Sequence, residues 1–232
     1  MVRFSLCIVA AALSIMATAA WADLFHGVPG GVFGHHALAG RFAQYQPRGA
    51  AAPAATKQPQ TATQSPASVY LLRGFMNVFS LGIDDLAAKI EANGITAAVA
   101  NHADAETLVA QIVSRYGAGD RGPIMLIGHS FGADAVIEMA QALDRSNIPV
   151  ALLILFDGTA PHQVPGNVAT AINFTLRYDL TPGGGFHGTI SNVDLRGTDG
   201  IDHFTIEKSP SLQAEALNYV LQAAAPSPER RR

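Results

Sequence analysis

The residues with the clearest capacity for chemistry are a serine and the glycines around it. Gly128-His129-Ser130-Phe131-Gly132 lies between an apolar run, 124–127, and a segment of helical spacing. A G-x-S-x-G between a strand and a helix forms a turn so tight that the serine takes strained backbone angles and side chains at Gly128 and Gly132 would collide with their surroundings. The turn exposes the Ser130 hydroxyl at a helix N-terminus, where the helix dipole favours negative charge. The pattern predicts a nucleophilic serine, and a Gly-rich structural turn is the alternative.

The segments around this turn alternate between two periodicities. Short apolar runs at 69–72, 95–100, 123–127 and 150–156 predict buried strands, and residues 169–176 and 189–195 predict two more. Helical spacing at 83–92, 103–116, 131–143 and 211–223 predicts the helices between and after them. Strands that alternate with helices form βαβ units. We therefore expect an α/β fold: one compact domain with a mostly parallel twisted sheet, helices on both faces and no room for a large lid.

Gly128-His129-Ser130-Phe131-Gly132 in this context resembles the α/β-hydrolase superfamily, and the resemblance covers roughly residues 69–224. Gly-His-Ser followed by an apolar residue is similar to the thioesterase and lipase branches. The resemblance implies a serine nucleophile, an acid and a histidine in that chain order. It also implies an acyl-enzyme intermediate that water resolves.

Carried onto this chain, the resemblance implies His203 as the base, because it follows the last predicted strand and precedes the final helix. The acid is either of two aspartates at strand ends. Asp157 ends the strand 150–156, where thioesterase-like members carry their acid, and Asp179 follows the next strand, where most other α/β hydrolases carry it. We favour Asp157 and keep Asp179 as the alternative.

Two backbone N–H groups are needed to stabilise an oxyanion. Phe131, directly after the nucleophile, is the first expected donor. The loop after the first core strand supplies the second: the resemblance points to Phe75, and Gly74 lets the backbone approach closely. Arg73 in the same loop is a candidate for binding an anionic substrate group or for a surface ion pair. We expect an open, shallow pocket, and its predicted lining is Phe75, Met76, Phe79, Phe131 and Phe186.

Composition excludes several other classes of function. The 232 residues are 49% hydrophobic and 14% charged, and the net charge of −3 gives no basic excess for nucleic-acid binding. One cysteine, Cys7, excludes a disulfide framework and Cys-rich metal sites. His26, His35 and His36 lack the spacing of a metal site, and no glycine-rich stretch matches a nucleotide-binding motif. We expect no cofactor and no metal.

The sequence outside the predicted core divides into three parts. Residues 1–22 combine Arg3, an apolar stretch and Ala20-Trp21-Ala22, which is the pattern of a cleaved signal peptide; an uncleaved membrane anchor is the alternative. Residues 23–68 are rich first in Gly and His and then in Pro, Ala, Gln and Thr, which predicts a flexible segment. The expected domain is 69–225, followed by a polar basic tail, 226–232. The protein should be exported, periplasmic or secreted, and should contact the membrane only if the leader stays uncleaved.

Together these features predict an exported serine hydrolase that cleaves a small or lipid-like acyl ester or thioester. A non-catalytic α/β-hydrolase-like binding or envelope protein is the alternative. Neither the acyl group nor the oligomeric state follows from the sequence.

Overall fold

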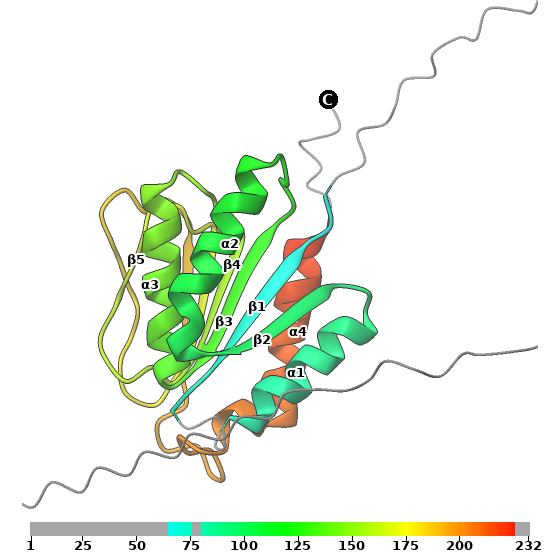
Figure 1. Cartoon of the computed structure of the whole chain (residues 1–232). Coiled ribbons are helices and arrows are strands. Elements are labelled where there is room, and N and C mark those ends of the chain that lie inside the picture. The colour runs from blue at the N-terminus through cyan, green and yellow to red at the C-terminus, as the bar shows by residue number, and fades with distance from the viewer. Residues whose placement is uncertain (1–64, 76–79, 226–232) are drawn as a thin grey trace, which may run out of the picture. The chain divides into compact units, whose positions relative to one another are not determined.

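The computed structural model describes residues 65–75 and 80–225 (Figure 1). The expected signal peptide, most of the flexible segment and the basic tail lie outside these residues. The first strand begins at Ser68, one residue before the predicted start of the domain.

A single sheet of six parallel strands forms the centre of the described chain (Figure 1). The spatial order is β2-β1-β3-β4-β6-β8. The strands are β1 (Ser68–Arg73), β2 (Thr96–Asn101), β3 (Ile124–His129), β4 (Leu152–Phe156), β6 (Thr170–Thr175) and β8 (Thr189–Asp194). The α/β prediction is confirmed, and each strand lies within about two residues of its expected bounds.

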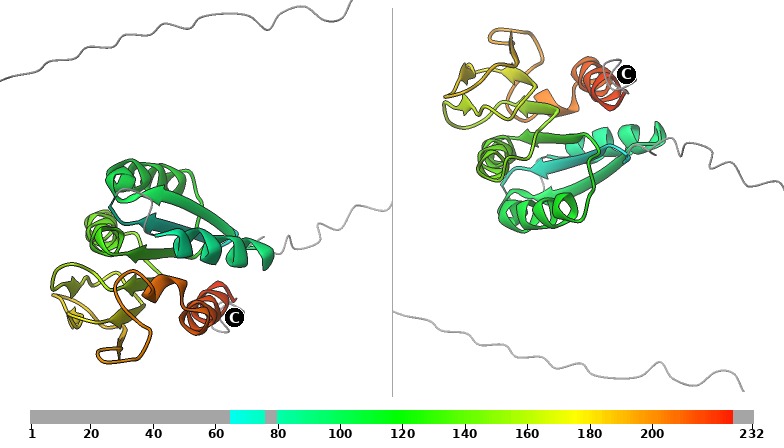
Figure 2. Two further views of the ribbon diagram at one scale, coloured as in Figure 1. Left: turned by 90° about the horizontal axis from the view of Figure 1, so that it is seen from below. Right: turned by 90° about the horizontal axis from the view of Figure 1, so that it is seen from above.

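Helices cover both faces of the sheet, as the two views of Figure 2 show. The helices are α1 (Leu81–Ala92), α2 (Ala105–Gly117), α3 (Phe131–Arg145) and α4 (Pro210–Ala224), with 3-10 turns at His102–Asp104 and Ile206–Lys208. Helices α2 and α3 pack on one face, and α1 and α4 on the other. Alternate residues of β1 serve the two layers, since Tyr70 and Leu72 join the first and Val69 and Leu71 the second.

The sequence did not predict a second, two-stranded sheet. It pairs β5 (Gln163–Val164) with β7 (Thr181–Pro182), in parallel. Strands of two residues are too short to show a periodicity, so only the packing of the loops after β4 and β6 creates them.

The chain order of the strands determines where a site can form. After β1 the chain passes to β2 on one side, and then returns to β3 on the other. Loops at the carboxyl ends of β1 and β3 therefore diverge, and this is the place where open α/β sheets commonly bind their ligands. This edge is the lower end of the sheet in Figure 1. Gly74 and Ser130 belong to it because they directly follow β1 and β3.

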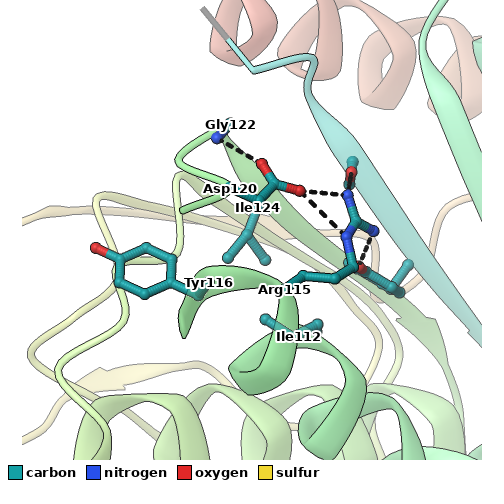
Figure 3. A pocket seen from close by; sticks show the side chains of 8 residues that line it. Ile112, Arg115, Tyr116, Asp120, Gly122 and Ile124 are labelled. Carbon is teal, nitrogen blue, oxygen red and sulfur yellow. Dashed lines mark hydrogen bonds and ion pairs between the residues drawn. The ribbon is translucent and has the colours of Figure 1, made fainter. Parts of the chain in front are cut away.

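A polar cluster around Arg115 lies at the opposite edge of the sheet, beside β1 and α2 (Figure 3). The guanidinium donates to the Tyr70 hydroxyl at 2.9 Å, to Ser68 Oγ at 3.1 Å and to Asp120 Oδ2 at 2.6 Å. The cavity beside it measures about 10 Å³, which is room for one water molecule at most. This cluster anchors α2 to β1 and leaves no space for a ligand.

Among the described helices, none is both long and apolar enough to cross a bilayer.

Leu71 packs between the sheet and the layer of α1 and α4, so truncating its side chain should strongly lower the stability of the fold. This side chain is fully buried in the central strand β1, and Leu71→Ala should lower the free energy of unfolding by about 2–5 kcal/mol. Leu221→Ala is the matched control, because Leu221 on α4 is 36% exposed and should cost less than about 1 kcal/mol. Urea unfolding measures both. Equal losses in the two variants would contradict the assignment of this core.

Candidate active site

Ser130 lies in a strained turn between β3 and α3. Its φ of 57° and ψ of −126° are rare for any residue other than glycine. The turn needs both glycines: a Cβ on Gly128 would lie 2.1 Å from the Gly132 carbonyl oxygen, and one on Gly132 would lie 2.1 Å from that of Leu72. The Ser130 amide donates to the Phe156 carbonyl at 3.0 Å, which holds the turn against β4. This is the nucleophile-elbow geometry that the motif predicts.

Ser130, His203 and Asp157 form one hydrogen-bonded row. His203 Nε2 lies 3.0 Å from Ser130 Oγ, and His203 Nδ1 lies 2.6 Å from Asp157 Oδ2. Ser130 and Asp157 are buried, and the His203 side chain is 26% exposed. A base that bonds both a hydroxyl and a carboxylate is arranged to take up the hydroxyl proton.

The alternative acid lies away from this row. The Asp179 side chain is 54% exposed, and its nearest cation is Arg196, at 3.8 Å. Asp157 directly follows β4 with a φ of 46°, and its amide donates to the Phe174 carbonyl of β6. The structure therefore places Asp157, and not Asp179, against His203.

Arg177 is a member of the cluster that the sequence reasoning missed. Its guanidinium lies 2.9 Å from Asp157 Oδ2 and 2.9 Å from His203 Nδ1. Burial alone would raise the pKa of the Asp157 carboxyl, but hydrogen bonds from His203, Arg177 and the Leu176 amide outweigh burial and lower the pKa below its usual value. Asp157 is thus held as an anion. The only signal in the sequence is the place of Arg177 after β6, at the same edge of the sheet as Asp157.

The expected oxyanion donors border Ser130. As the first residue of α3, Phe131 has an N–H without an acceptor inside the helix. Gly74 approaches closely, because a Cβ on it would lie 3.0 Å from Ser130 Cβ. The Gly74 N–H, however, already donates to Ser80 Oγ at 3.0 Å. Gly74 thus provides the close approach, and Phe75 remains the candidate for the second donor.

Three exposed aromatic side chains belong to the segments that carry the site. Phe75, Phe131 and Phe204 are 59%, 47% and 55% exposed, and the rings of Phe75 and Phe131 lie 6.1 Å apart. Two other expected lining residues, Met76 and Phe79, lie outside the described residues. Phe186 packs instead against the core on the α2–α3 side, because the loop after β7 folds over that face.

Arg73 forms the surface ion pair that was one of its two expected roles. Both Nε and Nη2 bond the carboxylate of Asp84 on α1, with Nε 2.8 Å from Oδ2. A guanidinium held in this way links the loop after β1 to α1.

Two further titratable groups lie buried beside the row. His129 of the motif is 1% exposed, and Glu207 is also 1% exposed. Neither carboxyl oxygen of Glu207 has a hydrogen-bond partner of normal geometry among the described residues, and Oε2 lies 3.8 Å from His129 Nε2. Burial raises the pKa of Glu207, and the nearby Lys208 offsets only part of that rise. No pattern in the sequence signals this buried carboxyl.

Comparison with known proteins supports the same reading. The family model of the Thioesterase domain matches residues 85–185, a stretch that contains Ser130 and Asp157 and ends before His203. Over that stretch the chain is similar to the Thioesterase domain family, and its fold is of the α/β-hydrolase type. This similarity supports hydrolysis of ester or thioester bonds. No sequence among curated proteins matches it.

Solved structures resemble this chain at low sequence identity. A cutinase-like protein from Cryptococcus sp. is 16% identical, covering 70% of this chain and 96% of its own, with a TM-score of 0.49. Human thioesterase 2 is 14% identical, with coverage of 69% and 99% and a TM-score of 0.46. A thioesterase of the prodiginine pathway in Streptomyces coelicolor is 16% identical, with coverage of 76% and 91% and a TM-score of 0.42.

The buried Glu207 predicts an unusual pH dependence of stability. A carboxyl whose pKa is raised in the folded state stabilises the fold fully below its unfolded pKa of about 4.3, and this stabilisation is lost as the pH rises through the folded pKa. Glu207→Gln imitates the protonated form. It should increase the free energy of unfolding at neutral pH by about 1 kcal/mol, because the burial cost of the carboxylate exceeds what Lys208, 3.5 Å from Oε1, restores, and it should converge with wild type in acid.

Urea unfolding between about pH 4 and 8 measures this difference. The matched control is Glu138→Gln, because Glu138 is exposed on α3 and should change stability by less than about 0.5 kcal/mol at any pH. A Glu207→Gln protein that is less stable than wild type at neutral pH would show that the ionised carboxylate contributes to the fold.

Proposed function

We propose that this protein is a serine hydrolase that cleaves an acyl ester or thioester through Ser130, His203 and Asp157. One observation carries the proposal: His203 lies between Ser130 Oγ, at 3.0 Å, and Asp157 Oδ2, at 2.6 Å. The strained turn that presents Ser130 and the match to the Thioesterase domain support it independently.

In this mechanism Ser130 Oγ attacks the acyl carbonyl carbon while His203 takes up the hydroxyl proton. Asp157 holds the imidazole ring by Nδ1 and stabilises the imidazolium that forms. The N–H groups of Phe131 and Phe75 stabilise the oxyanion. The proton then passes from His203 to the leaving group, and the acyl group remains on Ser130. A water molecule, activated by the same histidine, releases the acid and restores the serine.

The surroundings of Ser130 favour an apolar acyl group that is held at the surface. Phe75, Phe131 and Phe204 are each about half exposed and offer aromatic contacts. Small acyl esters and thioesters fit such a site best.

Export from the cytoplasm stays part of the proposal. It rests on the pattern of residues 1–22, which lie outside the described residues. An exported hydrolase would meet esters more readily than coenzyme A thioesters, because coenzyme A is cytoplasmic.

Covalent labelling tests the nucleophile. A fluorophosphonate probe should attach to Ser130 in the folded protein, and the label should be lost in Ser130→Ala and retained in Ser146→Ala, whose serine follows α3. A series of p-nitrophenyl esters and acyl thioesters of increasing chain length then defines the substrate. A folded protein that takes no label and hydrolyses none of the series would favour the non-catalytic binding or envelope protein.

Replacing each aspartate tests the acid. Asp157→Asn should lower kcat by about 10³–10⁴-fold, because an amide cannot hold His203 in the required tautomer. Asp179→Asn is the matched control and should change kcat less than about twofold, since its side chain is mostly exposed and bonds no group of the site. Steady-state hydrolysis of a p-nitrophenyl ester measures both. The opposite ranking would assign the acid to Asp179.

A further inference from the structure

A buried chain of hydrogen bonds runs through His129, beneath the row of Ser130, His203 and Asp157. The Gly74 N–H donates to Ser80 Oγ at 3.0 Å, and Ser80 Oγ lies 2.8 Å from His129 Nδ1. On the other side of the ring, His129 Nε2 lies 2.8 Å from the main-chain carbonyl oxygen of His203. Ser80 and His129 are each 1% exposed, so water does not compete for these bonds.

The acceptors in this chain determine where its protons lie. The His203 carbonyl can only accept, so His129 Nε2 carries a hydrogen and donates it. Ser80 Oγ already accepts from Gly74, and its own hydrogen is directed to His129 Nδ1, which must therefore be unprotonated. One arrangement satisfies every group: a neutral His129 with its hydrogen on Nε2.

The electrostatic surroundings agree with a neutral ring. Burial lowers the pKa of His129 to about 4, although its bond to the His203 carbonyl acts in the opposite direction. The ionisable groups that face it are Glu207, Lys208, His203 and Asp157. Protonated Nδ1 would confront the hydrogen of Ser80 and break the chain there.

This chain of hydrogen bonds connects two loops of the site whose relative position is not set by strand pairing. Gly74 precedes Phe75, the candidate oxyanion donor after β1, and His203 lies in the loop between β8 and α4. His129 is fixed between them because it immediately precedes Ser130 in the turn.

From this geometry we infer that His129 is a positioning residue, which sets the Phe75 N–H through Ser80 and Gly74, and the His203 ring through the His203 carbonyl. The inference rests on the proposed function, since it assigns to Phe75 and His203 the roles given above. It adds a reason for a histidine before the nucleophile: its two nitrogens can bond a donor and an acceptor at once.

The tautomer of His129 is tested without substrate. Long-range ¹H–¹⁵N spectra of the wild-type protein at about pH 7 should show a neutral ring with its hydrogen on Nε2. The Gly74 amide should exchange slowly, and its exchange should accelerate in Ser80→Ala. A hydrogen on Nδ1, a charged ring or a Gly74 amide indifferent to Ser80 would overturn the inference.

Kinetics test the positioning role. Ser80→Ala should lower kcat for a p-nitrophenyl ester by about tenfold or more and change KM less than about threefold, because small displacements of catalytic groups are costly. Ser68→Ala is the matched control: it removes another buried serine hydroxyl beside β1, the acceptor of Arg115 at the opposite edge of the sheet. It should lower the melting temperature and leave kcat unchanged. Equal kcat values in the two variants would overturn the inference.

A double-variant cycle separates this chain from general damage to the fold. His129→Gln retains a donor toward the His203 carbonyl and removes the acceptor for Ser80. Both single variants break the same hydrogen bond, between Ser80 and His129. The kcat of the double variant should therefore equal that of the slower single variant. Multiplying losses would overturn the inference. A wild-type protein that shows the tautomer but hydrolyses no ester would overturn the proposed function instead, and the spectra would still decide the hydrogen-bond chain.

Discussion

The geometry of the site depends on one strained residue. Ser130 can hold a φ of 57° only because the backbones of Gly128 and Gly132 pass within distances that a Cβ would forbid. Strain of this kind costs of order 1–3 kcal/mol and persists only where the surroundings enforce it. Here the parallel pairing of β3 with β1 and β4 enforces it, together with the packing of α3 on the sheet. The fold thus maintains the serine in a position that a free chain would abandon.

Parallel pairing also explains how distant residues meet. All six strands end at the same edge, so loops after β3, β4 and β6 deliver Ser130, Asp157 and Arg177 to neighbouring places. The loop before α4 then returns His203 across them. Each side chain comes from a different loop, and the sheet is the rigid part that these loops share. A shift of one strand register would separate the acid from its histidine.

The charges around this row are distributed unevenly. Asp157 is an anion supported by Arg177, whereas the two buried groups behind the row, His129 and Glu207, are shifted by burial toward their neutral forms. A neutral imidazole at His129 avoids placing another cation beside the imidazolium that forms on His203 during acylation. It also leaves His129 able to accept a hydrogen bond from Ser80, which a charged ring could not do.

Much of this arrangement follows from local patterns. The apolar runs and helical spacings predict all six main strands and the four helices, and Gly128-His129-Ser130-Phe131-Gly132 predicts the turn, because each of these signals depends on residues close together in the chain. Periodicity could not reveal β5 and β7, which are two residues long. Nor could it reveal that Phe186 packs on the core away from the serine.

The sequence by itself determined the fold class, the nucleophile candidate and the place of the histidine after the last strand. It narrowed the acid to Asp157 or Asp179 and left His129 without a role. Only the tertiary structure placed Asp157 against His203, set Arg177 beside both, and joined Gly74 to His203 through Ser80 and His129. The physical reason is that these contacts join residues far apart in the chain, and their distances are decided by how the loops pack at one edge of the sheet.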